Sequence, residues 1–153
     1  DYTVRMVLGT ESFVRQLKVV KQDAELYIVK PEVLSTLGDF QSNDAALAVV
    51  QMKKRNTLSI AQDNFTLLLD DIRDPGNLGT IIRTADWYGI THILASEETV
   101  DVYNTKVINA TKGSFTRVVV EYTDLSEVLT TNKLPVYGAF LAGQNVHQTA
   151  FPK

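Results

Sequence analysis

The sequence predicts an α/β protein made of two blocks, the second of which holds a mostly parallel sheet. Strand and helix signals alternate along the chain and their connections are short, an order typical of parallel strands joined by helices. The run Phe65–Leu69 is almost continuously apolar, which favours a strand buried on both faces of such a sheet. A polar stretch with little periodicity precedes this run and is interpreted as a linker. We therefore expect one domain at residues 1–54, a linker at 55–64 and a second domain at 65–153.

Three strands and two helices are expected in the first block. Gly9 closes the first strand, and Thr10 suits the N-cap of the helix that follows. Pro31 fits the first turn of the second helix, and Gly38 ends that helix. The expected strands span residues 4–8, 26–29 and 46–50, and the second helix spans residues 31–37.

The same alternation continues in the second block. A helix is expected over residues 78–88, with Asn77 as its N-cap and Gly89 directly after its end. Asp124 suits the N-cap of a later helix that runs through Leu129. The other expected helix spans residues 105–112, and the other expected strands span residues 92–95, 117–121 and 135–139.

Composition argues against several classes of protein. The net charge of −3 disfavours a protein that coats nucleic acid by charge alone, although a local basic face is compatible with it. No cysteine is present, which excludes disulfides and thiolate chemistry and fits a reducing, cytoplasmic location. His92 and His147 lack metal-ligand spacing, so no metal site is expected. No apolar run approaches the length that crosses a bilayer, so no membrane partner is expected.

The most informative segment is residues 70–89, which joins the apolar strand to the next helix. Ligands of open α/β sheets bind at this carboxyl end of a strand. On a helical wheel one arc is apolar and consists of Leu78, Ile81, Ile82, Ala85 and Tyr88. Gly79, Arg83 and Trp87 lie on the opposite side at intervals of four residues. Because glycine has no side chain, a ligand is expected to approach the helix beside Arg83, close to the amide of Asn77.

Ordinary structural roles are the alternative for these residues. Arg83 could be a solvated surface residue that pairs with Asp86 or stacks on Trp87, and Asn77 could be only a helix cap. The glycines of the turn could cradle a phosphate. However, a full dinucleotide fingerprint and a phosphate-loop lysine are both missing, which disfavours a dehydrogenase or a phosphotransferase.

The order of residues within this segment goes beyond such general chemistry. Residues 74–89, Asp-Pro-Gly-Asn-Leu-Gly-Thr-Ile-Ile-Arg-Thr-Ala-Asp-Trp-Tyr-Gly, resemble the first signature motif of the SpoU (TrmH-type) RNA methyltransferases of the SPOUT superfamily. Residues 103–114 resemble the next helix and small-residue turn of that family, and residues 138–143 resemble a later loop. Residues 7–11 and 40–50 resemble parts of the small ribosomal-protein-like α/β RNA-binding domain that often precedes the catalytic domain. The resemblance covers nearly the whole chain.

This resemblance implies a Rossmann-like SPOUT domain that transfers a methyl group from S-adenosylmethionine to a ribose 2′-hydroxyl of tRNA or rRNA. Such proteins usually work as homodimers. Asn77 and Arg83 match the active-site asparagine and the catalytic arginine of the motif. In this family the cofactor pocket lies in a C-terminal trefoil knot, and three segments of the chain contact the cofactor. Ala139, Phe140 and Leu141 match the first of these three segments.

The sequence departs from the family pattern after residue 143. Neither a Gly-Asn-Glu-type loop nor a Ser-Leu-Asn-type loop follows, so the chain is expected to be truncated before the trefoil knot and to be inactive alone. The alternative is a non-catalytic RNA-binding module.

Basic residues where the two blocks meet are candidates for RNA contacts. Lys53, Lys54 and Arg55 form a cluster there, and Arg5 lies in the first block. These cations could bind RNA phosphates, or they could form an ordinary solvated surface.

Overall fold

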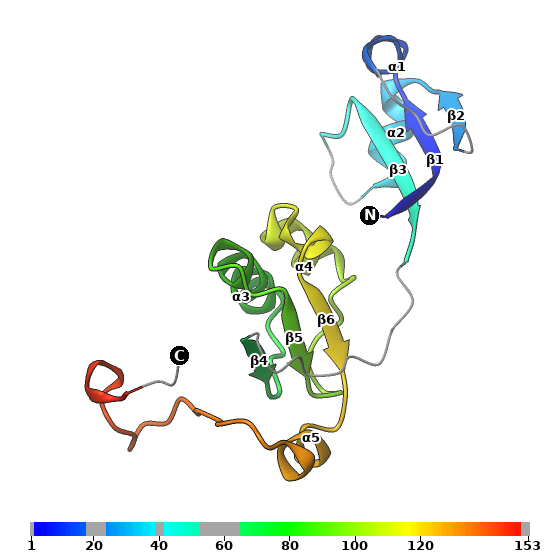
Figure 1. Ribbon diagram of the computed structural model, residues 1–153. Helices are drawn as coiled ribbons and strands as arrows, with labels where there is room; N and C mark the ends of the chain where they lie inside the picture. Colours follow the sequence, from blue (N-terminus) through cyan, green and yellow to red (C-terminus); the bar gives the residue numbers. More distant parts are fainter. Residues whose placement is uncertain (1, 18–23, 39–41, 53–64, 151–153) are drawn as a thin grey trace.

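The structure is a computed structural model that describes residues 2–17, 24–38, 42–52 and 65–150. It confirms a mixed α/β architecture with two three-stranded sheets, ordered β2-β1-β3 and β4-β5-β6 (Figure 1). The predicted linker at residues 55–64 lies outside the described residues. No helix in the described ranges is long and apolar enough to cross a membrane.

The first sheet combines a parallel and an antiparallel pair. Its strands are β1 (Thr3–Gly9), β2 (Glu25–Ile28) and β3 (Ala46–Gln51). β1 pairs with β2 in parallel and with β3 antiparallel. The helices α1 (Glu11–Gln16) and α2 (Pro31–Leu37) connect the strands. Leu34 of α2 is fully buried and Val7 of β1 is nearly so, which places the small core of this block between helix and sheet.

The second sheet is entirely parallel, as the alternating pattern predicts. Its strands are β4 (Thr66–Leu69), β5 (His92–Ala95) and β6 (Val119–Tyr122). β4 lies at the edge of this sheet, so its residues are half-buried and not covered on both faces as expected. The helices are α3 (Pro75–Trp87), α4 (Thr105–Thr111) and α5 (Leu125–Thr131), with short 3-10 helices η1 (Ser114–Thr116) and η2 (Val146–Gln148).

Helices α3 and α4 pack closely against each other through Gly79. This glycine is buried, and a Cβ added to it would overlap the Cβ of Ala110 and lie 2.9 Å from the carbonyl oxygen of Val107. The expectation that Gly79 leaves the helix open to a ligand is therefore wrong, because α4 occupies that space. Leu78 and Ile82 of α3 complete the core with Val107 and Ile93.

Three other expectations for the second block are corrected. Asp74, not Asn77, caps α3, because the Asp74 carboxylate accepts a hydrogen bond from the Asn77 backbone N–H at 2.7 Å. The strand expected over 117–121 begins two residues later, after η1. Residues 135–139 form no strand, and three of the side chains there, Val136, Tyr137 and Ala139, are exposed. In the first block, Thr10 precedes α1, but its side chain makes no capping hydrogen bond.

Tyr2 connects the two parts of the molecule. Its hydroxyl lies 3.3 Å from the hydroxyl of Tyr103, which precedes the N-cap of α4. Its ring meets that of Tyr103 edge-on, with centroids 6.5 Å apart, and lies 5.5 Å from the ring of Phe115 in η1. Burial and the Tyr103 hydroxyl raise the pKa of Tyr2 well above its ordinary value, so this contact is made by a neutral phenol at physiological pH.

Candidate active site

The connection from β4 to α3 places the first candidate residue at the carboxyl end of the sheet. Pro75 occupies the first turn of α3, where a missing N–H costs nothing. The Asp74 carboxylate satisfies the N–H of Asn77. Because the backbone of Asn77 is held in this way, its side-chain amide does not cap the helix and stands exposed at the helix start.

Two buried hydroxyl groups hold this connection in place. Ser96 Oγ accepts a hydrogen bond from the backbone N–H of Asp71 at 2.9 Å. Thr99 Oγ1 accepts a hydrogen bond from the backbone N–H of Ile72 at 3.2 Å. Both side chains are buried, and their hydroxyls lie 3.3 Å apart. Asp71 has a φ of 52°, a left-handed backbone conformation that non-glycine residues rarely adopt. The loop after β5 therefore fixes the loop after β4.

Sequence reasoning missed Ser96 and Thr99. The available signal was their position directly after a predicted strand, at the same edge of the sheet as the candidate motif. Hydroxyl residues are common in loops, so position alone did not distinguish them. Their role depends on backbone groups more than twenty residues away, as the hydrogen bonds to residues 71 and 72 show.

Arg83 presents a positive charge on the exposed side of α3. It makes no hydrogen bond or ion pair with any residue in the described ranges. The pairing with Asp86 that was the ordinary alternative does not form. The Asp86 carboxylate binds Arg117 Nη2 at 2.5 Å and accepts a hydrogen bond from Ser114 Oγ at 2.7 Å.

Arg117 and Ser114 hold Asp86 in its ionised form. The hydrogen bonds from Arg117, followed by the one from Ser114, lower the pKa of Asp86 below its ordinary value. The same contact raises the pKa of Arg117. Since this carboxylate is already satisfied by other groups, Arg83 has no neutralising partner one turn away on its own helix.

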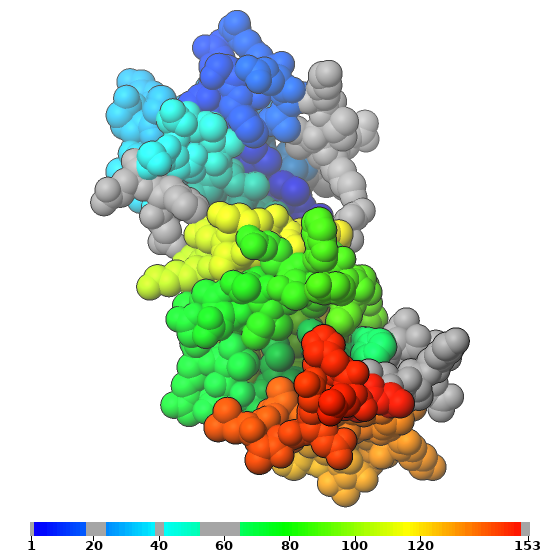
Figure 2. All heavy atoms as spheres, turned by 90° about the vertical axis from the view of Figure 1, so that its left-hand side faces the viewer, coloured from blue at the N-terminus to red at the C-terminus, as the bar shows by residue number. Residues whose placement is uncertain are grey.

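The candidate cofactor segment stands apart from α3. Phe140 is 81% exposed, Leu141 is fully exposed and Ala139 is exposed as well. Both views place residues 138–150 and α3 on the same side of the molecule (Figures 1 and 2). No described hydrogen bond joins this segment to Asn77 or Arg83, so the structure does not gather the three parts into one closed site.

Of the candidate RNA-binding residues, only Arg5 lies within the described ranges. It stands exposed on β1 and donates a hydrogen bond to the side-chain oxygen of Gln51 on β3. Lys53, Lys54 and Arg55 lie outside the described residues.

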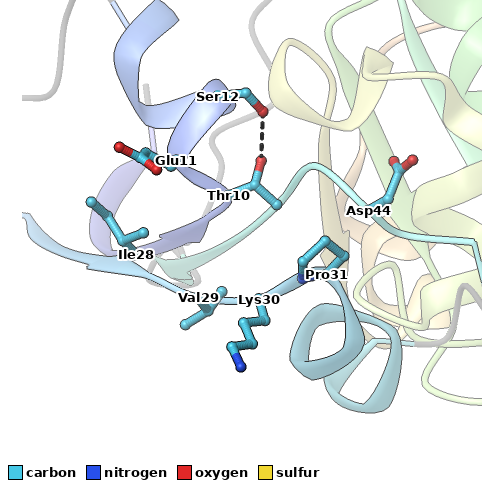
Figure 3. A pocket seen from close by; sticks show the side chains of 8 residues that line it. All are labelled: Thr10, Glu11, Ser12, Ile28, Val29, Lys30, Pro31 and Asp44. Carbon is cyan, nitrogen blue, oxygen red and sulfur yellow. Dashed lines mark hydrogen bonds between the residues drawn. The ribbon is translucent and has the colours of Figure 1, made fainter.

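A shallow pocket of 510 Å³ lies in the first block, where β1 and β2 end and α1 and α2 begin (Figure 3). Thr10 and Ser12 line one wall with hydroxyls 3.1 Å apart, and Lys30 and Asp44 contribute opposite charges. None of the site residues predicted from the sequence lines this pocket.

Known proteins resemble this chain along most of its length. Residues 64–153 match the model of the SpoU rRNA Methylase family. A 23S rRNA (guanosine(2553)-2'-O)-methyltransferase of Bacillus subtilis is 29% identical over 120 residues, covering 76% of this chain and 47% of that protein. The mitochondrial rRNA methyltransferase 3B of Danio rerio is 28% identical over 149 residues, covering 91% of this chain and 31% of that protein. The chain thus spans less than half the length of either relative.

Solved structures share the fold. A TrmH-family protein of Porphyromonas gingivalis aligns with 99% of this chain and 61% of its own, at a TM-score of 0.86 and 32% identity. The SpoU methyltransferase AviRb of Streptomyces viridochromogenes, in complex with AdoMet, aligns with 84% of this chain and 52% of its own, at a TM-score of 0.66 and 25% identity. The first of these alignments includes both sheets, so the similarity extends to the two parts together.

Proposed function

The chain belongs to the SpoU rRNA methylase family, and on that premise we propose that it functions in an RNA methyltransferase that modifies a ribose 2′-hydroxyl of rRNA or tRNA. The observation that carries the proposal is the exposed guanidinium of Arg83 on α3, which has no acidic partner among the residues that the structure describes, with the exposed amide of Asn77 at the start of the same helix. Relatives named as rRNA 2′-O-methyltransferases support this choice of substrate.

Arg83 acts by electrostatics and not as a base. A guanidinium carries only N–H donors and has no free acceptor, so it cannot take the proton of the hydroxyl. A ribose hydroxyl is a weak nucleophile at neutral pH, so negative charge developing on its oxygen has to be stabilised. Arg83 binds the adjoining phosphate through its planar fork and favours that charge.

Asn77 acts from a different side of α3. Six residues correspond to about 9 Å along the axis and roughly a third of a turn around it. Asn77 therefore positions the sugar from the mouth of the sheet, while the longer side chain of Arg83 reaches toward the same sugar. An amide both donates and accepts hydrogen bonds, which suits a ribose with neighbouring hydroxyls.

The proposed methyl donor is S-adenosylmethionine, because the related AviRb structure contains AdoMet. The segment Ala139, Phe140 and Leu141 offers apolar contacts to such a molecule, but its exposure shows that it does not enclose one. We therefore propose that the described chain alone does not retain the donor and is inactive without further cofactor-binding segments. Isothermal titration with S-adenosylmethionine should give no saturable heat; tight binding by this chain would contradict that proposal.

The main test is Arg83→Lys in a form of the protein that transfers methyl groups. Lysine keeps the charge but loses the planar fork, so turnover should fall by about a hundredfold, as expected for the loss of one aligned donor. The matched control is Arg73→Lys, because Arg73 is also exposed but is paired with Asp71 at 2.6 Å; its turnover should change little. Wild-type turnover in Arg83→Lys, with normal RNA affinity, would refute the role of Arg83.

The second candidate function is RNA binding without catalysis. The exposure of residues 139–141 to solvent favours this non-catalytic function. The basic cluster Lys53, Lys54 and Arg55 remains a proposed phosphate contact, with Arg5 beside Gln51 as a further one. Neutralising the cluster should flatten the salt dependence of RNA affinity. RNA affinity without methyl transfer in any form of the protein would favour this second function.

We further propose that the methyltransferase is a cytoplasmic homodimer. The relative from the bacterium Bacillus subtilis supports the cytoplasm as the location, whereas the Danio rerio relative is named mitochondrial. Sedimentation equilibrium would measure the mass in solution, and a fluorescent fusion would locate the protein. A monomer at all concentrations, or targeting to an organelle, would contradict the corresponding part of the proposal.

A further inference from the structure

The pocket of the first block is formed by three connections that backbone hydrogen bonds hold together (Figure 3). The backbone N–H of Thr10 donates to the carbonyl oxygen of Ala45 at 3.0 Å. The backbone N–H of Val29 donates to the carbonyl oxygen of Gly9 at 2.9 Å. The walls are therefore fixed before a ligand arrives, as is usual for binding sites. The volume of 510 Å³ lies within the range of about 300–1,000 Å³ that is typical of small-molecule sites.

One wall of this pocket carries hydrogen-bond acceptors. Thr10 Oγ1 donates to the carbonyl oxygen of Ala45 at 3.4 Å and lies 3.1 Å from Ser12 Oγ. In that arrangement Ser12 donates to Thr10, and the lone pairs of Ser12 Oγ can accept a further hydrogen bond. The Asp44 carboxylate adds two acceptor oxygens and makes no hydrogen bond or ion pair within the described ranges. A ligand at this wall therefore has to supply donors, such as hydroxyl groups.

Lys30 provides a positive charge at another part of the pocket. Figure 3 shows the Lys30 ammonium and the Asp44 carboxylate pointing away from each other, with Pro31 between them. Lys30 makes no ion pair with any residue that the structure describes. The other acid of the pocket, Glu11, is paired with Arg15 at 2.5 Å. The pocket thus separates a position for one anionic group from a wall that accepts hydrogen bonds from hydroxyls.

We propose that this pocket binds one unpaired nucleotide of the RNA substrate. Its ribose 2′-hydroxyl donates to the hydroxyl pair of Thr10 and Ser12, and its phosphate lies at Lys30. The exposed side chains of Ile28 and Pro31 offer an apolar surface to the base. The inference rests on the proposed RNA substrate and adds a contact in the first block. The 2′-hydroxyl is the group by which a protein distinguishes RNA from DNA.

The shape of the pocket favours a nucleotide within a strand over a free nucleotide. The pocket is shallow and open to solvent, so a strand can enter on one side and leave on the other. Lys30 is the only cationic residue among those that line it. Free nucleotides with several phosphates are held by glycine-rich loops and a lysine together. A phosphate between two sugars carries one negative charge, which one lysine matches.

The 2′-hydroxyl contact is tested with strands that differ in that group. The chain is titrated with oligouridylate and with oligodeoxyuridylate of the same length, without a methyl donor, and the anisotropy of a dye on each strand is recorded. The RNA should bind roughly three- to tenfold more tightly, the ratio expected for one hydrogen bond. Equal affinity for the two strands, or no binding of either strand, would overturn the proposal.

The double variant Thr10→Val/Ser12→Ala removes the two hydroxyls. It should lower the affinity for RNA to that for the deoxy strand and leave the affinity for the deoxy strand unchanged. Because Thr10 makes no capping hydrogen bond to α1, the helix should persist. The matched control is Thr36→Val, since the Thr36 hydroxyl donates to the Val33 carbonyl oxygen outside the pocket. A preference for RNA that survives the double variant would overturn the proposal.

Lys30→Gln tests the phosphate contact. It should weaken the binding of both strands equally and reduce the slope of log affinity against log salt by about 0.7, the value for one phosphate of a single strand. Lys133→Gln is the matched control, because Lys133 is an exposed lysine after α5. An unchanged slope in Lys30→Gln would overturn the contact. Uridine monophosphate that displaces the RNA at an equal concentration would show a site for free nucleotides and overturn the assignment to a strand.

These binding measurements separate the pocket from the proposed methyl transfer. A preference for RNA that depends on Thr10 and Ser12, in a protein that never transfers methyl groups, would contradict the methyltransferase and retain the pocket. Conversely, methyl transfer with a wild-type KM for RNA in the double variant would overturn the role of the pocket alone.

Discussion

At the scale of single residues, Gly79 is the position where the smallest change should have a large effect. An added Cβ would overlap Ala110 and lie 2.9 Å from the Val107 carbonyl oxygen, and both are parts of a packed helix. Gly79→Ala should therefore lower the free energy of unfolding by roughly 1–3 kcal/mol, the usual cost of overpacking. Urea denaturation measures this change in the free energy of unfolding. Thr84→Ala on the exposed side of α3 is the control and should stay within about 0.5 kcal/mol of wild type; equal stability of both variants would contradict the close packing.

The ion pair of Asp86 predicts a dependence of stability on pH. Arg117 and Ser114 lower the pKa of Asp86 in the folded protein relative to its ordinary value of 3.8. A lowered pKa means that the stabilisation is complete above the ordinary value and is lost as the pH falls through the folded-state pKa. Asp86→Asn should therefore reduce the Tm near neutral pH, and the difference from wild type should shrink in strong acid. A difference that is the same at both extremes would show that the carboxylate charge is not responsible.

At the scale of secondary-structure elements, the start of α3 depends on one side chain. Asp74 Oδ1 accepts the hydrogen bond of the Asn77 N–H at 2.7 Å. Asp74→Ala should cost about 1 kcal/mol of stability, whereas Asp74→Asn should cost little because asparagine caps equally well. Thermal denaturation of the two variants tests this. Since the cap also fixes the backbone of Asn77, Asp74→Ala should lower methyl transfer if Asn77 has its proposed role.

Elements that depend on local patterns were predictable from the sequence. The apolar positions of α3 and Gly89 after its end are visible within one segment, and the structure places Leu78, Ile82 and Ala85 in the core. Even the correct cap had a local signal, because a proline directly after Asp74 marks the first helical residue. The prediction over residues 135–139 failed because a strand also requires a partner strand, which an apolar run does not supply.

The candidate site was predictable only in part, because a local pattern does not show which distant residues contact it. The motif located Asn77 and Arg83, and both are exposed on α3. The residues that hold this region act over long sequence distances. Ser96 bonds to the backbone of Asp71, and Arg117 binds Asp86 thirty-one positions away. Gly79 was misread because its neighbour, α4, is not visible in the periodicity of α3.

At the scale of the whole molecule, Tyr2 contacts the second block from a position directly before β1. Its hydroxyl lies 3.3 Å from that of Tyr103, and its ring lies 5.5 Å from that of Phe115. Aromatic pairs of this kind contribute about 0.5–1.5 kcal/mol beyond the area they bury. If the first block delivers RNA to α3, this contact restricts the angles from which the RNA can arrive.

Tyr2→Ala should therefore loosen the two parts without unfolding either. Small-angle scattering should show a broader distribution of distances, and amide exchange of residues 103–115 should become faster. Tyr2→Phe is the matched control, because it keeps the ring contacts with Phe115 and loses only the hydroxyl contact. In wild type, the raised pKa of Tyr2 means that the contact holds below the ordinary value of 10.0 and weakens only in stronger alkali. Scattering and exchange that do not change in Tyr2→Ala would show that the two parts are held together by something other than this cluster.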